Sequence, residues 1–293
     1  MANITAVMVK ELRERTGLGM MDCKKALSAS EGDMEQAIED LRKSSGMKAA
    51  KKAGRVAAEG VVMTKIAEDG NYAVILEINS ETDFVSKDEN FLDFAQQTLD
   101  LAYANKDADV AALLDAGVEL AREKLVQKVG ENINVRRVDR LKFKDANQGI
   151  VDSYVHNNNQ IGVIIALRGG DETLARDIAM HIAAVNPMVI RKEDVPADVI
   201  AKESAIYSAQ ARESGKPEEI IEKMISGRLN KFVAEVSLME QQFVKNPDVK
   251  ISGLLKDAGA DIVNFIRYEV GEGIEKVEVD FADEVAAQVK GGS

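Results

Sequence analysis

Apolar residues recur three and four positions apart through the first 45 residues, in short stripes separated by polar turns. Gly17 and Gly19 follow the first stripe, and glycine is the residue that most readily ends a helix. Side chains that cap helix N-termini stand before the three stripes: Thr5, Asp22 and Asp33. The pattern predicts a three-helix domain over residues 1–54.

Beyond residue 60 the apolar period becomes two, which is the spacing of a half-buried strand. The alternating apolar or β-branched positions are Val62, Thr64, Ile66, Tyr72, Val74, Leu76 and Ile78. Asp69 and Gly70 form a turn signal between the two runs. The segment therefore predicts a β-hairpin whose strands each show one face to the core.

Two helices and a third strand are predicted after the hairpin. Ser86 and Glu89 have the spacing of a capping box, which predicts that the first helix begins at Ser86. The second helix is predicted over about 108–128 and the strand over 132–138. With the hairpin, these elements form a first core subdomain over residues 55–142.

The same order of elements then repeats. Two strand-like runs flank an asparagine-rich turn within residues 149–167, and an apolar helical stripe follows over 171–184. A late alternating run over 265–271 supplies a third strand. Residue identity between the halves is weak, but the repeated order predicts a duplicated core whose second subdomain comprises residues 143–193 and 237–272.

Residues 194–236 interrupt the second half with a different pattern. Pro196 and Pro217 each suit the start of a helix, and a glycine-containing turn separates the two helices. The returning helix has a broad apolar stripe made of Ile220, Ile221, Met224, Ile225, Leu229, Phe232 and Val233. The segment predicts an antiparallel helical hairpin, or short coiled coil, with a candidate contact surface. The last module, 273–293, is predicted to carry a short helix.

Length and composition support one fold class. A chain of 293 residues with 45% apolar content is long enough for roughly two domains and a sizeable core. The elements predict an α+β protein with an N-terminal three-helix domain, a duplicated core with small antiparallel sheets, an inserted antiparallel helical hairpin and a C-terminal helix.

The net charge of the chain restricts the classes of partner that it can bind. A net charge of −12 argues against direct binding of nucleic acid or a membrane surface, because both need a basic footprint. The lysine-rich stretch 47–60 lacks interleaved aromatic residues, so it is interpreted as a solvated helix or linker. The favoured partner is a soluble protein.

The sequence predicts a cytoplasmic protein. Cys23 is the single cysteine and has no intramolecular disulfide partner, which favours a reducing compartment. The N-terminal segment has no uninterrupted apolar stretch typical of a signal peptide. No window approaches the roughly 18 apolar residues of a membrane span.

Enzyme chemistry has little support in the sequence. The two histidines, His156 and His181, are far apart, and His181 lies in an apolar helical stretch that favours a structural role. Metal-ligand clusters, a P-loop and the dinucleotide-binding glycine pattern are missing. The residues therefore predict an interaction protein that is not an enzyme and has no cofactor.

An acidic stretch, Ser-Glu-Thr-Asp-Phe-Val-Ser-Lys-Asp-Glu-Asn-Phe over residues 80–91, carries one aromatic side chain in an unusual place. Most phenylalanines are buried, which favours a core role for Phe84. The predicted capping box at Ser86 opposes that role, because it leaves Phe84 ahead of the helix with no local packing partner. A role in binding is the alternative.

Two stretches carry a specific likeness to a known family. Leu12-Arg13 with Thr16-Gly17-Leu18-Gly19-Met20-Met21-Asp22-Cys23-Lys24-Lys25-Ala26-Leu27 resembles the N-terminal signature of bacterial translation elongation factor Ts. Glu77 with Glu81-Thr82-Asp83-Phe84-Val85 is similar to the second signature of that family. The likeness extends over nearly the whole chain. Leu18 departs from the small residue expected there, while the flanking glycines and methionines match.

The resemblance implies a guanine-nucleotide exchange factor for the GTPase elongation factor Tu, with a ubiquitin-associated-like N-terminal domain and no bound cofactor. Such a factor binds the GDP form, displaces Mg²⁺ and promotes GDP release so that GTP can bind. The element implied to dislodge Mg²⁺ and enter beside the nucleotide consists of Thr82, Asp83, Phe84 and Val85. Arg13, Met20 and Met21 would contact the G domain, and His156 a more distant domain of the GTPase.

Three alternatives stay open at this point. The helical hairpin joins two copies of the chain, as a homodimer or in a 2:2 complex, or it meets the GTPase. Met20 and Met21 either bind a partner or cover the small helical core. The whole chain is either the exchange factor or, as rival classes, a helical adaptor or an RNA-binding protein that uses its basic stretch.

Overall fold

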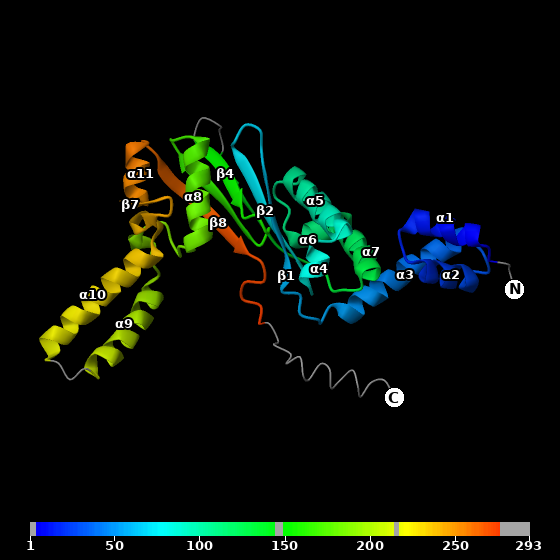
Figure 1. Cartoon of the computed structure of the whole chain (residues 1–293), viewed down its shortest axis with the longest axis horizontal. Helices are drawn as coiled ribbons and strands as arrows, with labels where there is room; N and C mark the ends of the chain where they lie inside the picture. Colours follow the sequence, from blue (N-terminus) through cyan, green and yellow to red (C-terminus); the bar gives the residue numbers. More distant parts are fainter. Residues whose placement is uncertain (1–3, 144–148, 214–216, 276–293) are drawn as a thin grey trace. The chain divides into compact units, whose positions relative to one another are not determined.

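The computed structural model describes residues 4–143, 149–213 and 217–275. It confirms an α+β structure whose described strands form two three-stranded sheets and one two-stranded sheet (Figure 1). The chain divides into two compact units. The described parts of residues 1–61, 77–137 and 270–293 form the first unit, and those of 62–76 and 138–269 form the second. The domain boundaries drawn from the sequence stay a prediction.

The first unit contains most of the helices. They are α1 (Ala6–Thr16), α2 (Met20–Ala29), α3 (Met34–Lys52), α4 (Asp83–Ser86), α5 (Glu89–Ala104), α6 (Val110–Leu113), the π-helical turn η1 (Leu114–Val118) and α7 (Glu119–Val129). The first sheet has the strand order β1-β2-β3, with β1 (Glu59–Ile66), β2 (Tyr72–Ser80) and β3 (Asn134–Lys142). Residues 59–61, 77–80 and 134–137 of these strands belong to the first unit and the rest to the second. Within this unit, α3 packs along α7 and α7 packs against α5.

Helices α1 to α3 confirm the predicted N-terminal bundle. Thr5 caps α1 by accepting a hydrogen bond from the amide of Met8, and Gly17 ends the helix in the left-handed conformation at φ 69°. The bundle encloses one small core made of Val9, Leu12, Leu18, Cys23, Leu27, Ala37 and Leu41. The prediction that Asp22 caps α2 is wrong. Gly19 is the N-cap, and Asp22 lies in the first turn, where its charge still suits the helix dipole.

The predicted capping box of Ser86 and Glu89 is also wrong. The chain first makes the one-turn helix α4 with Thr82 as its N-cap, and α5 then begins at Glu89 with Asp88 as its N-cap. Asp88 accepts a hydrogen bond from the amide of Asn90 and so satisfies a donor of the first turn of α5. The carboxylate at Asp88 supplies the cap that the sequence interpretation had assigned to Ser86.

Strand β2 departs from the predicted alternation. All nine of its residues are buried, so both faces of this central strand are covered. Glu77, Asn79 and Ser80 are polar and still fully buried. The alternation was misleading because Glu77, Ser80 and the Nδ2 atom of Asn79 form hydrogen bonds within the protein rather than with water, while Oδ1 of Asn79 is buried without a partner.

The helix predicted over 108–128 is interrupted. The structure has α6, the π-helical turn η1 and α7 in succession. Gly117 lies inside η1 with φ 108° and ψ −5°, a conformation outside the helical region. A glycine takes up this conformation at low cost, and the helix therefore changes direction there.

The second unit repeats the plan of strand, strand, helix and strand, which confirms the predicted duplication at the level of elements. Its sheet has the order β4-β5-β8, with β4 (Ile150–Val155), β5 (Ile161–Arg168) and β8 (Asp261–Glu269) antiparallel to their neighbours. Helix α8 (Glu172–Val185) is capped by Asp171 and packs on β4 and β5. Its apolar face forms the core of this unit with residues such as Val163, Ile178 and Ile182.

Smaller elements complete the second unit. They are η3 (Lys192–Asp194), α9 (Ala197–Arg212), α10 (Glu218–Val236), η4 (Leu238–Glu240), β6 (Gln242–Phe243), β7 (Asn246–Lys250) and α11 (Ile251–Asp257). Helices α9 and α10 pack on each other and confirm the predicted hairpin. Pro196 and Pro217 stand at the N-cap positions, one residue before each helix. The short helix predicted in 273–293 lies at Phe281 to Val289, outside the described residues.

Candidate functional site

The turn at Thr82 to Val85 presents an apolar side chain to solvent. Phe84 exposes 82% of its surface, whereas Ser86 at the end of the same turn is buried. Phe84 therefore has no core role in this chain, and the conclusion that it lacks local packing stands even though the predicted capping box does not. A large aromatic group in this position is a candidate for burial on a partner.

Hydrogen bonds within the turn define its shape. The Thr82 hydroxyl accepts from the amide of Val85 at 3.4 Å, which caps α4. The Ser86 hydroxyl donates to the carbonyl of Asp83 at 2.9 Å, and the Ser80 hydroxyl donates to the carbonyl of Thr82 at 2.9 Å. The sequence Thr-Asp-Phe-Val-Ser thus closes into one tight turn that points Phe84 outward.

The residues that follow α7 hold this turn from behind. The Glu131 carboxylate accepts from the amides of Glu81 and Thr82 at 3.1 and 3.0 Å and from the Thr82 hydroxyl at 2.6 Å. In return, the Glu81 carboxylate accepts from the amide of Asn132 at 2.5 Å. The sequence interpretation missed Glu131, because only the fold brings it to the turn across about 50 residues of chain.

Asp83 forms an ion pair within its own chain. Its carboxylate lies 2.7 Å from the ammonium of Lys87 four residues later. That hydrogen bond and the charge of Lys87 lower the pKa of Asp83, so the carboxylate is ionised at neutral pH. The turn therefore offers an apolar ring beside a negative charge, and Lys87 is the residue that a partner must compete with for Asp83.

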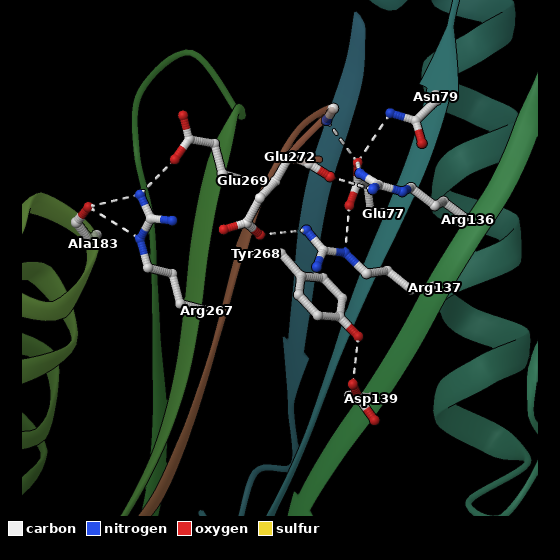
Figure 2. A network of polar contacts seen from close by, with 11 residues as sticks. Glu77, Asn79, Arg136, Arg137, Asp139, Ala183, Arg267, Tyr268, Glu269 and Glu272 are labelled. Atoms are coloured by element: carbon white, nitrogen blue, oxygen red, sulfur yellow. Dashed lines mark hydrogen bonds and ion pairs between the residues drawn. The ribbon is translucent and has the colours of Figure 1, made fainter. Parts of the chain in front are cut away.

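Below the turn, a buried carboxylate joins β2, β3 and the segment after β8 (Figure 2). Glu77 accepts from Arg136 at 2.9 Å, Arg137 at 2.6 Å, the amide of Gly271 at 2.9 Å and Asn79 at 3.0 Å. Burial alone raises the pKa of Glu77, but these hydrogen bonds and the charge of Arg137 outweigh burial, and the pKa is lowered. The network keeps the end of β2, from which the turn departs, in a fixed position.

The predicted N-terminal site residues lie on the surface of the helical bundle. Met20 and Met21 are 59% and 65% exposed, and Arg13 is exposed on α1. The two methionines therefore do not cover the helical core, which Leu18 and Cys23 fill instead. Exposed methionines adapt to a partner surface, and the assignment of these residues to a partner stays a prediction.

His156 and His181 differ in their surroundings. His156 is exposed at the turn after β4, with its Nδ1 atom 3.1 Å from the hydroxyl of Tyr154, beside a surface pocket of about 490 Å³. His181 is buried, and its Nε2 atom lies 2.9 Å from Oε1 of Gln241 while Nδ1 accepts from the amide of Val244. Burial lowers the pKa of His181 more than the Gln241 hydrogen bond raises it, so the ring is neutral. This environment supports the predicted structural role of His181.

Among the residues that the structure describes, no cluster of three or more His, Cys, Asp or Glu side chains has metal-binding geometry. Cys23 is buried in the core of the bundle. The described helices include none that is long and apolar enough to cross a membrane.

Comparison with known proteins gives matches over nearly the whole chain. The family model described as "Elongation factor TS" matches residues 81–272. The chain is 64% identical to Elongation factor Ts of Hahella chejuensis over 99% of this chain and 100% of that protein. It is 60% identical to Elongation factor Ts of Marinobacter nauticus over 98% of both chains, and 56% identical to that of Francisella tularensis subsp. novicida over 99% and 100%.

These matches define the class of protein, which is a translation elongation factor. With a family model that covers most of the chain and relatives aligned over nearly its full length, the chain belongs to the elongation factor Ts family.

Proposed function

We propose that this elongation factor is a guanine-nucleotide exchange factor for the GTPase elongation factor Tu and acts in the cytoplasm. It binds the GDP form, displaces Mg²⁺ from the nucleotide site and promotes GDP release so that GTP can bind. The observation that carries the proposal is the 82% exposure of Phe84 on a turn whose backbone is fixed by hydrogen bonds on both sides.

The chemistry of the turn suits a nucleotide site that depends on Mg²⁺. The metal neutralises the phosphates and joins them to the GTPase, so its removal weakens the hold on GDP. Phe84 gains roughly 1.5 to 3 kcal/mol by burial in a partner pocket. Asp83 brings a negative charge toward groups that otherwise bind the metal or phosphate. No covalent step by this chain is needed, so the factor is not an enzyme in the chemical sense.

Burial of Phe84 alone is too small for a large effect. A thousandfold faster release requires a barrier lower by about 4 kcal/mol. The remainder has to come from other contacts, and Arg13, Met20 and Met21 on the N-terminal bundle are the residues we assign to the G domain. His156 beside its surface pocket is assigned to a second domain of the GTPase.

Binding and release are linked in this proposal. Whatever the factor removes from the affinity of the GTPase for GDP, the nucleotide removes from the affinity for the factor. Either nucleotide therefore releases the factor when it rebinds. The factor changes the rate of exchange and leaves the final distribution between GDP and GTP to their concentrations.

The test is the release of fluorescent GDP from purified elongation factor Tu, with and without this protein. We expect strong acceleration by the unmodified chain and an acceleration roughly ten- to a hundredfold weaker in Phe84→Ala, because the contacts of the N-terminal bundle remain. Val263→Ala removes another exposed apolar side chain, on β8, and should exchange normally. No acceleration by the unmodified chain would falsify the exchange function, while a fully active Phe84→Ala variant would remove only the role of the ring.

The stoichiometry is a separate proposal about the hairpin of α9 and α10. Ile206 and Ile220 are exposed on it, which leaves apolar surface for a second copy of the chain or for the GTPase. Light scattering of the free chain separates these cases. A mass of 31.9 kDa indicates a monomer whose hairpin is free for the GTPase, and twice that mass indicates a homodimer.

A further inference from the structure

One carboxylate behind the turn binds three donors of the turn at once. Glu131 accepts from the Glu81 amide, the Thr82 amide and the Thr82 hydroxyl at 3.1, 3.0 and 2.6 Å. Bonds to an ionised acceptor are about twice as strong as neutral ones. All three donors lie immediately before Asp83 and Phe84, so Glu131 fixes the backbone from which these two side chains extend.

The position of Glu131 is unfavourable for a helix-stabilising role. It follows Gly130, the residue that ends α7 in the left-handed conformation at φ 84°. The C-terminal end of a helix carries partial negative charge, and a carboxylate there is repelled rather than attracted. The three hydrogen bonds to the turn offset this repulsion. The location of the charge is therefore explained by the turn and not by α7.

The next residue extends the contact to the end of the helical bundle. The amide of Asn132 donates to Glu81, and its side chain donates to the carbonyl of Arg55 at 2.9 Å. Arg55 in turn lies 3.5 Å from the Glu81 carboxylate. Residues 131 and 132 thus hold the turn and the segment that follows α3, the helix shared with the N-terminal bundle.

We propose that Glu131 is a positioning residue for the Thr82 to Val85 turn, which it holds in the binding conformation before the partner arrives. The inference rests on the exchange function proposed above. Helix α4 has only four residues, and so short a helix is unstable without outside contacts. When Glu131 is removed, the turn has to be ordered at the moment of binding, and part of the binding energy of Phe84 is lost to that ordering.

The test separates positioning from general binding. Fluorescent GDP release from elongation factor Tu is measured against the concentration of the factor, which gives a maximal release rate and a half-saturating concentration. Glu131→Ala is expected to lower the maximal rate roughly tenfold, equivalent to about 1.4 kcal/mol of barrier. The half-saturating concentration should change much less, because the contacts from the N-terminal bundle remain. Glu131→Gln keeps an acceptor for the amides, so its maximal release rate should lie between those of the unmodified chain and Glu131→Ala.

A matched control removes the same charge nearby without touching the turn. Glu89 is exposed at the start of α5 and takes no part in the Glu131 hydrogen bonds. Glu89→Ala should keep the maximal rate of the unmodified chain. An equal loss in both variants would show that net charge, and not the position of the turn, determines the rate, and it would overturn the inference.

The deciding measurement is a double-mutant cycle with Phe84. If Glu131 acts through Phe84, then Glu131→Ala should cost little further rate in a Phe84→Ala background. Additive losses would mean that Glu131 acts by general stability, and an unchanged rate in Glu131→Ala would mean that it has no role. Both outcomes refute positioning while the unmodified chain still exchanges, so they are distinct from failure of the exchange function.

Discussion

At the scale of single residues, Phe84 is the clearest departure from ordinary burial. It is more exposed than any other large apolar side chain that the structure describes. General statistics favour a buried phenylalanine, so sequence physics alone pointed the wrong way. The family likeness assigned Phe84 to a partner. The structure adds the reason that this position is open, which is that Thr82 and Ser86 close the turn and leave Phe84 outside it.

The exposure of Phe84 gives a prediction for stability. Phe84→Ala should change the free energy of unfolding by no more than about 0.5 kcal/mol, because an exposed side chain loses little on truncation. Phe91 is seven positions later and fully buried, so Phe91→Ala should cost about 3 to 5 kcal/mol. Urea unfolding followed by circular dichroism measures both. A large loss in Phe84→Ala would show that the ring packs on its own chain.

At the scale of elements, β2 shows what a periodic pattern can and cannot reveal. The alternation correctly predicted the strand and its hairpin, because backbone geometry sets a period of two. It could not reveal that Glu77 is buried, since the partners of that carboxylate come from β3 and from the segment after β8 (Figure 2). The buried acid therefore depends on tertiary structure that no local window contains.

Glu77 gives a prediction for stability against pH. The pKa of Glu77 is lowered in the folded chain, so its contribution is complete above the unfolded pKa of about 4.3. That contribution is lost as the pH falls through the folded value. Glu77→Gln should destabilise the chain by about 3 kcal/mol at pH 7, because Arg136 and Arg137 lose their buried partner.

Urea unfolding from pH 7 down to the acid transition tests this prediction. The difference between Glu77→Gln and the unmodified chain should shrink as the pH falls. A difference that stays constant with pH would mean that the charge of Glu77 is not responsible. Exposed Glu39→Gln, which removes a surface ion pair with Lys43, should have an effect below about 1 kcal/mol.

The interrupted helix gives a second prediction at this scale. Gly117 has φ 108° and open space where the methyl group of an alanine would lie, so Gly117→Ala should cost about 1 to 2 kcal/mol through backbone strain alone. Gly227 lies inside α10 with helical geometry and similar open space. Gly227→Ala should therefore stabilise the chain by about 0.5 to 1 kcal/mol. Thermal unfolding of the two variants should shift in opposite directions, and shifts of the same sign would contradict the conformation of Gly117.

At the scale of the whole molecule, the order of elements was predictable and the details of their ends were not. Apolar periodicity predicted both three-stranded sheets, the bundle and the hairpin of α9 and α10, and it missed the two-stranded sheet of β6 and β7 and the short helix α11. The errors fell at Asp22, Ser86 and Gly117, where several polar or small residues compete for one helix boundary. The candidate site was likewise predictable only in part. Thr82 to Val85 could be named from the chain, while Glu131 required the fold.

The net charge of the whole chain gives the last prediction, which concerns its lysine-rich stretch. In the folded chain this stretch faces acceptors of the protein itself: Lys48 lies 3.7 Å from Asp22, Lys52 donates to the carbonyl of Gly130, and Arg55 approaches Glu81. A chain with net charge −12 that already pairs these cations has little positive surface for phosphate.

We therefore expect no gel shift of a single-stranded RNA at physiological salt with up to about 10 μM protein. That concentration lies within the Kd range of non-specific nucleic-acid binders, roughly 10⁻⁴ to 10⁻⁶ M. Lowering the salt should produce at most weak binding, because long-range repulsion by the acidic surface grows as screening falls. The RNA-binding alternative predicts the opposite, a shift that strengthens steeply at low salt. Such a shift, if Lys51→Ala weakened it, would show that the basic stretch is a nucleic-acid site.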